Sequence, residues 1–218
     1  MKQRFRSLKN AVSCYAGTKS RLIRGSKSGI AESAGKSLST ETEIKVKIED
    51  VAAFYRQVNG LNPKGLAERH FEDNYLLDFP DRRLQTGQCL LRVRLAKGSG
   101  FLTFKGEPRP EGIFKIREEL ETRLEDGATM LQVLGRIGMS VCFRYQKYRR
   151  EFLLDDVHIA VDETPIGNYV EFEGTEEGIR ALAARMGIAE SRFLRSSYYS
   201  LYLEHCRRAG MVPSFMVY

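Results

Sequence analysis

Charged and apolar residues alternate with a period of two along several segments beyond residue 40. In residues 41–48 the charged side chains fall on one side of an extended strand, and Ile44, Val46 and Ile48 fall on the other. The same alternation, with turn residues between the segments, predicts seven further strands over 67–78, 89–96, 101–105, 115–123, 141–154 with a break near Arg150, 157–163 and 168–173.

Four segments carry helical signals instead. Asp50 precedes the amphipathic segment 51–58, which Asn59-Gly60 and Pro63 end, and further helices are expected at 128–137, 175–186 and 196–207. Strands outnumber helices about two to one and do not follow a βαβ rhythm. The pattern therefore predicts an α+β fold, with an antiparallel sheet or barrel and helices packed on its outside.

The polar faces of seven predicted strands consist almost entirely of charged residues. For a single strand, a solvated face with cross-strand ion pairs is the more common explanation. Over seven strands another arrangement is favoured, because the helices need the apolar faces, and the charged faces can then converge inside a closed barrel. The buried charges of such a lumen need partners of opposite charge. A polyanion bound by Arg and Lys and divalent cations bound by Glu and Asp would supply them.

The net charge of +7 belongs to the N-terminal segment 1–40. That segment holds nine of the 35 Lys and Arg residues and one of the 28 acidic residues, so it carries +8 and residues 41–218 carry −1. Its Ser, Gly and Ala content predicts a disordered tail. An inert extension is favoured over an organelle transit peptide or an electrostatic arm. Nucleic-acid binding is expected at most through this tail.

Other features exclude several classes of protein. No stretch approaches 18 apolar residues and the first thirty residues lack the apolar region of a secretory signal, so we expect a cytoplasmic protein with no membrane partner. The four cysteines form no CxxC pair. Free thiols are therefore expected, and neither a zinc site nor a disulfide framework.

Eight short motifs resemble, in order, the CYTH domain of the triphosphate tunnel metalloenzymes. The motifs are Glu41-x-Glu43-x-Lys45, Leu91-Arg92-Val93-Arg94, Leu102-Thr103-Phe104-Lys105-Gly106, Arg117-x-Glu119-x-Glu121, Lys147-x-Arg149, Asp162, Gly167-Asn-Tyr-Val-Glu171-Phe-Glu173-Gly174 and Ser197-Tyr198. The resemblance spans about residues 41–203. It implies an eight-stranded antiparallel tunnel over residues 41–207, followed by a C-terminal tail at 208–218. The tunnel would bind a triphosphate and one or two divalent cations, Mg²⁺ or Mn²⁺.

The resemblance also implies roles for individual residues. The metal ligands would be Glu41, Glu43, Asp162, Glu171 and Glu173. The phosphate-binding residues would be Lys45, Arg92, Arg94, Lys105, Arg117, Lys147 and Arg149, and the catalytic ones Glu43, Lys45 and Arg149. Glu119 and Glu121 match two further acids that are either second-metal ligands or charge-balancing partners. In one departure, this chain has Arg195 and Ser197 where some family members carry a lysine near the last helix.

Three functions fit this residue set. The first is metal-dependent hydrolysis of a triphosphate such as ATP, thiamine triphosphate or inorganic triphosphate. The second is cyclisation of ATP to cAMP and pyrophosphate, which also needs a base for the ribose 3′-hydroxyl. The third, a non-catalytic polyphosphate-binding or nucleotide-binding module, is disfavoured by the five carboxylates. Hydrolysis is favoured because cyclisation also requires the ribose hydroxyl to be positioned for attack. The sequence does not determine the oligomeric state, and a homodimer is one option.

Overall fold

Eight antiparallel strands close into a barrel in the computed structural model, which describes residues 39–218. The strands are β1 (Ser39–Ile48), β2 (Lys64–Asp78), β3 (Leu90–Ala96), β4 (Ser99–Lys105), β5 (Lys115–Leu124), β6 (Ser140–Leu154), β7 (Val157–Thr164) and β8 (Gly167–Glu173). Their order around the barrel is β1-β5-β4-β3-β2-β6-β7-β8. The predicted barrel is thus confirmed. Of the predicted N-terminal tail, Ser39 and Thr40 belong to β1, and the prediction for residues 1–38 lies outside the described residues.

The four predicted helices are present with small shifts of their ends. They are α1 (Val51–Gly60), α3 (Gly127–Arg136), α4 (Glu176–Arg185) and α5 (Tyr198–Ala209). The sequence did not predict α2 (Arg83–Thr86) or the 3₁₀ turn Glu190–Arg192. The predicted break near Arg150 is wrong, because β6 keeps its pairing with β7 there, where Arg150 lies opposite Val161.

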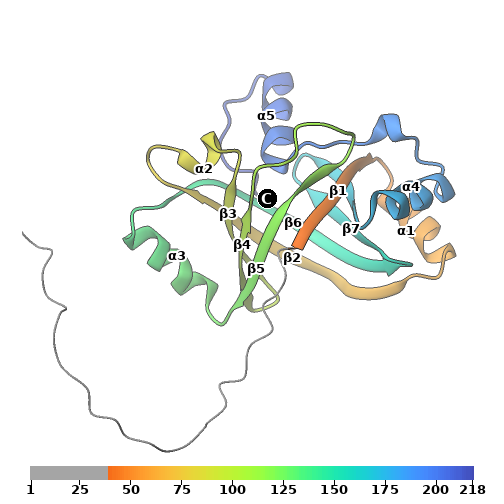
Figure 1. The fold of residues 1–218 in the computed structure, drawn as a ribbon, viewed down its shortest axis with the longest axis horizontal. Helices are drawn as coiled ribbons and strands as arrows, with labels where there is room; N and C mark the ends of the chain where they lie inside the picture. Colours follow the sequence, from red (N-terminus) through yellow and green to blue (C-terminus); the bar gives the residue numbers. More distant parts are fainter. Residues whose placement is uncertain (1–38) are drawn as a thin grey trace, which may run out of the picture. The chain divides into compact units, whose positions relative to one another are not determined.

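Helices α1 and α4 cover the apolar side of the barrel wall at one flank (Figure 1). Ile44, Val46 and Ile48 point outwards from β1 and pack in one buried cluster with α1 and α4 side chains such as Val58 and Ile179. Asp50 caps α1 by accepting a hydrogen bond from the Ala53 N–H at 2.9 Å. Because the helices take the aliphatic faces of the strands, the charged faces are left to the interior of the barrel.

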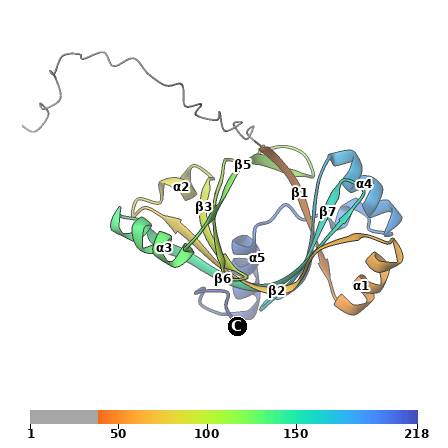
Figure 2. The same ribbon diagram turned by 90° about the horizontal axis from the view of Figure 1, so that it is seen from below.

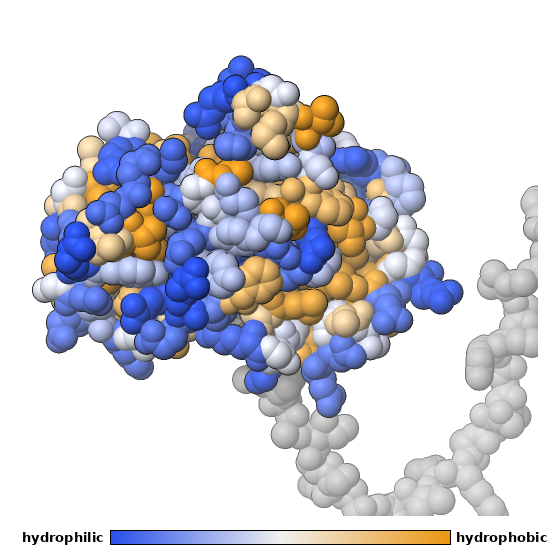
Figure 3. Space-filling model, turned by 180° about the vertical axis from the view of Figure 1, so that it is seen from behind, coloured by the Kyte–Doolittle hydropathy of each residue, from blue (hydrophilic) through white to orange (hydrophobic). Residues whose placement is uncertain are grey.

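Two further helices complete the outer layer. α3 packs over β3 and β4 on the opposite flank, where Val93 and Leu134 share a buried cluster. α5 lies across one end of the ring of strands (Figure 2), where its Tyr202 packs against Phe143 of β6 and its Tyr198 against Tyr145. On the face seen in Figure 3, apolar residues lie among hydrophilic ones. Within residues 39–218 no helix is both long and apolar enough to cross a membrane.

The C-terminal residues pack on the barrel beyond the end of α5. Gly210 adopts a left-handed conformation (φ 65°) that ends the helix. Further on, the Met216 N–H donates to the Arg144 carbonyl at 3.0 Å and the Met216 carbonyl accepts from the Gln146 N–H at 2.9 Å. Met216 is buried, so the segment 208–218 contributes a short parallel bridge to the outside of β6.

Replacing Gly100 by alanine should destabilise the contact between β4 and α3. A Cβ atom at Gly100 would lie 2.6 Å from the Gly127 Cα, a backbone atom that cannot rotate away. We expect Gly100→Ala to lower the free energy of unfolding by about 1–3 kcal/mol in urea denaturation. Gly135→Ala in α3 is the matched control, because a Cβ atom at that position would meet nothing within 4 Å, and it should raise stability by about 0.5–1 kcal/mol.

Candidate functional site

The inner wall of the barrel is built from the charged positions of the alternating strands. On β1, Glu41, Glu43 and Lys45 are 6%, 5% and 4% exposed, whereas the Lys47 side chain is half exposed beyond the end of the lumen. Most of the predicted site residues from the other strands, several of them distant in sequence, lie inside the barrel with these three, whereas Glu173 is exposed at the end of β8. The cationic side chains in the lumen are Lys45, Arg92, Arg94, Lys105, Lys115, Arg117, Lys147 and Arg149.

The two glutamates of β1 are each held by more than one cation. Glu41 accepts a short hydrogen bond from Lys105 and lies 3.4 Å from the Arg117 Nε. Glu43 lies 2.9 Å from the Lys115 Nζ and 3.4 Å from the Lys45 Nζ. Their environments shift their two pKa values in opposite directions. Burial and Glu43 raise the pKa of Glu41 to about 7. Although burial opposes it, Lys45 and Lys115 hold the pKa of Glu43 well below its usual range.

Lys45 occupies the middle of this network. Its Nζ lies 3.0 Å from the Glu171 Oε1 and 5.3 Å from the centre of the Tyr198 ring. Burial lowers its pKa, but Glu171 and Glu43 raise it above the usual value, so the ammonium group stays charged. Its backbone forms two hydrogen bonds with Leu194, of 2.9 and 2.8 Å, which fix this point of β1 against the segment before α5.

Asp162 of β7 is fully buried and both of its oxygens are engaged. Oδ1 accepts from the Arg149 Nε at 2.7 Å, and Oδ2 accepts from the Lys147 Nζ at 2.9 Å and the Tyr198 hydroxyl at 2.6 Å. Arg149 also donates to Glu171. In this arrangement Asp162, expected from the resemblance to be a metal ligand, orients two phosphate-binding candidates.

Glu119 and Glu121, for which the sequence leaves two roles possible, lie beside predicted phosphate-binding residues. Glu121 accepts from Arg94 at 3.1 Å, from Arg92 at 3.4 Å and from the Thr103 hydroxyl at 2.7 Å. Glu119 lies 2.8 Å from the Lys105 Nζ. Both acids therefore form ion pairs with lumen cations.

Sequence reasoning missed several lumen residues. Glu72, 2% exposed, lies 3.5 Å from both Arg94 and Lys147. The sequence pattern does not identify Glu72 as a lumen residue, because β2 carries polar residues on both faces, among them the outward Asp73. Lys115 starts the same period-two series as Arg117 and could have been found by extending it by one step. Asn74 is fully buried, and its amide has no hydrogen-bond partner among the described residues.

Two cavities open the barrel towards different ends. One of about 400 Å³ is lined by the basic residues Lys45, Lys115 and Lys147 and reaches α2 and the start of α5. The other, of about 690 Å³, is lined by several glutamates, among them Glu41 and Glu173, and also by Arg92, Arg94, Lys105 and Arg149. Arg92, Lys105 and Glu171 line both cavities. The lumen is therefore accessible from two ends of different charge.

The acidic end provides donors of the kind that a hard divalent cation requires. Carboxylate oxygens are the preferred ligands of Mg²⁺ and Mn²⁺, but among residues 39–218 no three acidic, His or Cys side chains already form a ready-made cluster. Glu173 forms no ion pair with a described residue, and burial followed by the charge of Glu119 raises its pKa. Glu41 contacts Lys105 and Arg117 but also has a raised pKa, so Glu41 and Glu173 are the carboxyl groups at this end that fit a cation.

Comparisons with known proteins agree on one family. The CYTH domain model matches residues 39–194. A Methanocaldococcus jannaschii protein named "Putative adenylate cyclase" is 30% identical over 173 residues, which are 74% of this chain and 97% of that protein.

Solved structures show the same fold. A Vibrio parahaemolyticus structure, also named a "putative adenylate cyclase", has a TM-score of 0.64 at 23% identity, covering 73% of this chain and 95% of that one. A Hippeastrum structure, described as a "putative adenylyl cyclase" with a dominant triphosphatase activity, has a TM-score of 0.55 at 17% identity, covering 79% and 97%.

Proposed function

The chain belongs to the CYTH domain family, and from this premise we propose that it is a divalent-metal-dependent enzyme that hydrolyses a triphosphate inside the barrel. The observation that carries the proposal is the convergence of cationic side chains from β1, β3, β4, β5 and β6 on one buried lumen that also contains carboxylates. Cationic groups at fixed positions stabilise the charge that develops on phosphoryl oxygens during transfer.

The residues of the chain divide the work of binding and orientation. Lys45, Lys147 and Arg149 are held in place by carboxylates, so they need little reorganisation to meet phosphate oxygens. Arg92 and Arg94 offer planar guanidinium groups suited to pairs of phosphate oxygens. Asp162 accepts hydrogen bonds from Lys147, Arg149 and the Tyr198 hydroxyl, and so orients Lys147 and Arg149.

A cation would be held by Glu41 and Glu173 at the acidic end, together with Glu171, which lines both cavities, and Glu43, which follows Glu41 on the inner face of β1. When bound, Mg²⁺ or Mn²⁺ supplies charge neutralisation on a phosphoryl oxygen and a water of lowered pKa. The lumen carboxylates also repel free anions, which favours binding of the triphosphate together with its counter-cations. The barrel wall limits the number of water molecules around the reacting phosphate.

Cyclisation of ATP is the alternative, since relatives carry the name adenylate cyclase. It would need a base near the ribose 3′-hydroxyl. Among the described residues that line the cavity at the basic end there is no histidine, and the carboxylates of Glu43, Asp78 and Glu171 are each engaged by other groups. This set of partners supports hydrolysis, in which water is the nucleophile.

A direct assay tests the proposal. ATP, thiamine triphosphate and inorganic triphosphate are incubated separately with the full chain and Mg²⁺ or Mn²⁺, and phosphate, pyrophosphate and cAMP are all quantified. We expect phosphate as the main product from at least one substrate and no turnover in excess EDTA. Mainly cAMP and pyrophosphate would establish the cyclase instead, and no product from any substrate would refute both enzymes.

Binding of Mg²⁺ should release protons below neutral pH, because Glu41 must be ionised to act as a ligand. With its pKa raised to about 7 by burial and by Glu43, the carboxyl is mostly protonated at about pH 6 and mostly ionised at about pH 8. We expect the Mg²⁺ affinity to rise with pH across this window and the proton release to vanish above it. Calorimetric titrations in two buffers of different ionisation enthalpy measure both quantities.

Two variants serve as controls for this linkage. Glu41→Gln should remove most of the pH dependence, because an amide does not titrate. Glu118→Gln, at an exposed position of the same barrel on β5, should leave it unchanged. Equal pH dependence in the wild type and in Glu41→Gln would show that Glu41 is not the linked group.

A further inference from the structure

One fully buried polar side chain in the lumen has no hydrogen-bond partner among residues 39–218. Asn74 of β2 is 0% exposed, and both its Oδ1 and its Nδ2 lack a partner in this part of the chain. A buried amide without a partner has lost its hydrogen bonds to water and gained none in return, which destabilises the folded protein. Proteins retain such costs mainly at functional sites.

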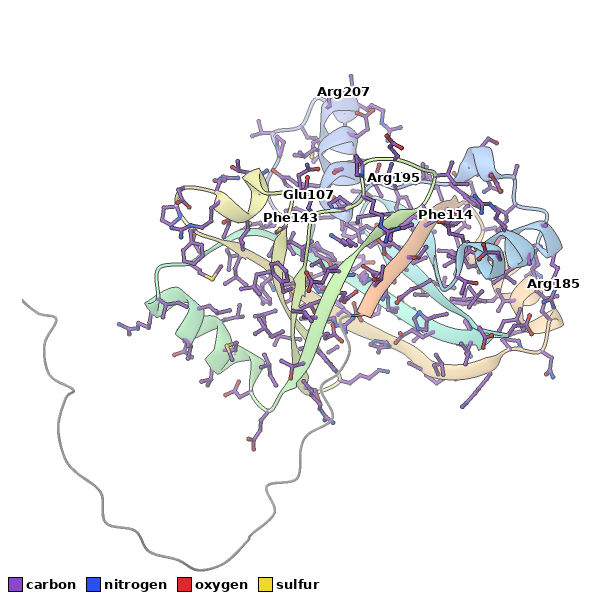
Figure 4. All side chains as sticks on the ribbon, viewed as in Figure 1. Glu107, Phe114, Phe143, Arg185, Arg195 and Arg207 are labelled. Carbon is purple, nitrogen blue, oxygen red and sulfur yellow. The ribbon has the colours of Figure 1, made fainter. Side chains whose placement is uncertain are left out.

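The neighbours of Asn74 on both adjacent strands belong to the lumen. In the antiparallel ladders Asn74 lies directly opposite Arg94 of β3 and Tyr145 of β6, and directly opposite residues point to the same face of the sheet. Along β2 the same face carries Glu72, which lies 3.5 Å from Arg94, and Leu76, which lines the cavity at the basic end. Side chains fill the interior of the barrel densely (Figure 4). Asn74 therefore points into the barrel beside a predicted phosphate-binding arginine.

Arg94 contains a hydrogen-bond donor that could pair with Asn74. Its Nε is buried and also lacks a partner among the described residues, whereas its two Nη groups are held by carboxylates. Nη2 lies 3.1 Å from the Glu121 Oε1, and Nη1 lies 3.5 Å from the Glu72 Oε1. An unpaired amide oxygen and an unpaired guanidinium N–H thus belong to directly opposite residues, and a change of the Arg94 rotamer would bring them together.

The other arginine of β3 shows the satisfied form of this arrangement. Arg92 lies directly opposite Thr103 of β4. Its Nη2 donates to the Thr103 hydroxyl at 3.1 Å, and that hydroxyl donates to Glu121 at 2.7 Å. Each of the two arginines thus has a neutral polar residue directly opposite it on an adjacent strand. Of these two pairs, that of Asn74 and Arg94 is the one without a hydrogen bond between its members.

A bound phosphate would weaken the contacts that hold Arg94 in its present position. Phosphate oxygens compete with Glu121 and Glu72 for the two Nη groups. Once the guanidinium turns towards a phosphate, its Nε needs an acceptor, and the Asn74 Oδ1 supplies one. Because the amide is neutral, it does not compete with the phosphate for the positive charge, as a carboxylate at this position would.

We propose that Asn74 is a positioning residue that accepts a hydrogen bond from the Arg94 Nε when triphosphate is bound, and so presents both Nη groups of Arg94 to phosphate oxygens. This inference rests on the proposed function for the phosphate site and adds a residue that positions one of its cations. Asn74 acts through Arg94 and does not touch the substrate, which agrees with its complete burial.

Calorimetric titration of the full chain with non-hydrolysable imidotriphosphate and Mg²⁺ tests this role. Asn74→Leu keeps the branched shape of the side chain and removes its polar atoms. We expect it to weaken binding about tenfold, the size expected for losing one hydrogen bond to a charged group. Arg94→Met should weaken binding at least as much, and the double variant should bind within about twofold of Arg94→Met. Unchanged affinity of Asn74→Leu, or additive effects of the two substitutions, would overturn the inference.

Urea denaturation without added triphosphate separates this role from a structural one. Asn74→Leu should keep or raise the midpoint of the wild type, because it removes an unpaired buried amide. Thr103→Val is the matched control, since Thr103 is equally buried and also lies opposite an arginine but forms its hydrogen bonds. It should lower the midpoint. A comparable drop in both variants would indicate a structural role of the amide and overturn the inference.

A smaller side chain provides a second variant if leucine does not fit. Asn74→Ala removes the same amide and should reproduce the loss of imidotriphosphate affinity, again without a further loss in the Arg94→Met background. Wild-type affinity of a folded Asn74→Ala variant would overturn the inference.

Hydrolysis and the role of Asn74 can fail independently. Binding of imidotriphosphate by the wild type without phosphate release from any triphosphate would refute the proposed hydrolysis and leave the role of Asn74 to the calorimetric test. Hydrolysis by the wild type, together with an unchanged KM for triphosphate in Asn74→Leu, would refute the role of Asn74 alone. No binding of imidotriphosphate by the wild type would refute both.

Discussion

Replacing Lys45 by methionine should reduce kcat/KM for the triphosphate about a hundredfold to a thousandfold, the usual effect of removing one preorganised charge from a phosphoryl-transfer site. The ammonium group is buried among Glu43, Glu171 and the Tyr198 ring, so solvent cannot replace it. The barrel should stay folded, because methionine has a similar length. In addition, Glu43 keeps Lys115 and Glu171 keeps Arg149 as partners.

Lys47→Met is the matched control on the same strand. Lys47 is half exposed and pairs at 3.4 Å with Glu49, which is almost fully exposed. Such a surface pair contributes little, so we expect unchanged turnover and an unchanged melting temperature. Comparable losses of activity in both variants would indicate that β1 tolerates no change of charge, and would remove Lys45 from the candidate catalytic residues.

Asp162→Asn should have the largest effect on stability. The substitution leaves Lys147 and Arg149 buried with one carboxylate fewer, and breaking a buried ion pair on one side costs about 3–5 kcal/mol. Chemical denaturation measures this loss. Inorganic triphosphate should stabilise the variant more than it stabilises the wild type, because the ligand would supply the negative charge that the substitution removes.

The neighbouring Glu163 provides a control on the other face of β7. Its side chain pairs with Arg69 at 2.8 Å, and Arg69 is 46% exposed, so Glu163→Gln should cost about 1 kcal/mol or less. Similar losses for the two substitutions, or no extra stabilisation of Asp162→Asn by triphosphate, would contradict the role of Asp162 as the orienting carboxylate of the lumen.

The barrel and its charged interior could be predicted because both depend on local geometry. A strand places successive side chains on opposite faces, so the residue types along 41–48 reveal which face is charged before any tertiary contact is known. The same period does not show which acid pairs with which cation. For example, Glu121 and Arg94 lie 27 residues apart in sequence and meet through the pairing of β3, β4 and β5.

The cavity at the basic end could not be predicted, because its walls come from elements of the fold whose sequences share no common pattern. Phe143 and Tyr145 continue the inner face of β6 beyond its charged positions, and α2 is too short to produce a helical period. Tyr198 and Tyr202 pack in a buried cluster. The hydrogen bond from the Tyr198 hydroxyl to Asp162 depends on the placement of α5 across the barrel end.

The pairing of lumen cations with lumen carboxylates has a thermodynamic consequence for ligand entry. A phosphate chain that binds Arg94 competes with Glu121 and Glu72, and one that binds Lys105 competes with Glu41 and Glu119. Each displaced carboxylate then needs a positive partner, which a divalent cation supplies. Anion and cation should therefore show heterotropic cooperativity, in which each raises the affinity of the other by the same factor. We therefore expect the barrel to bind either ion weakly when the other is absent.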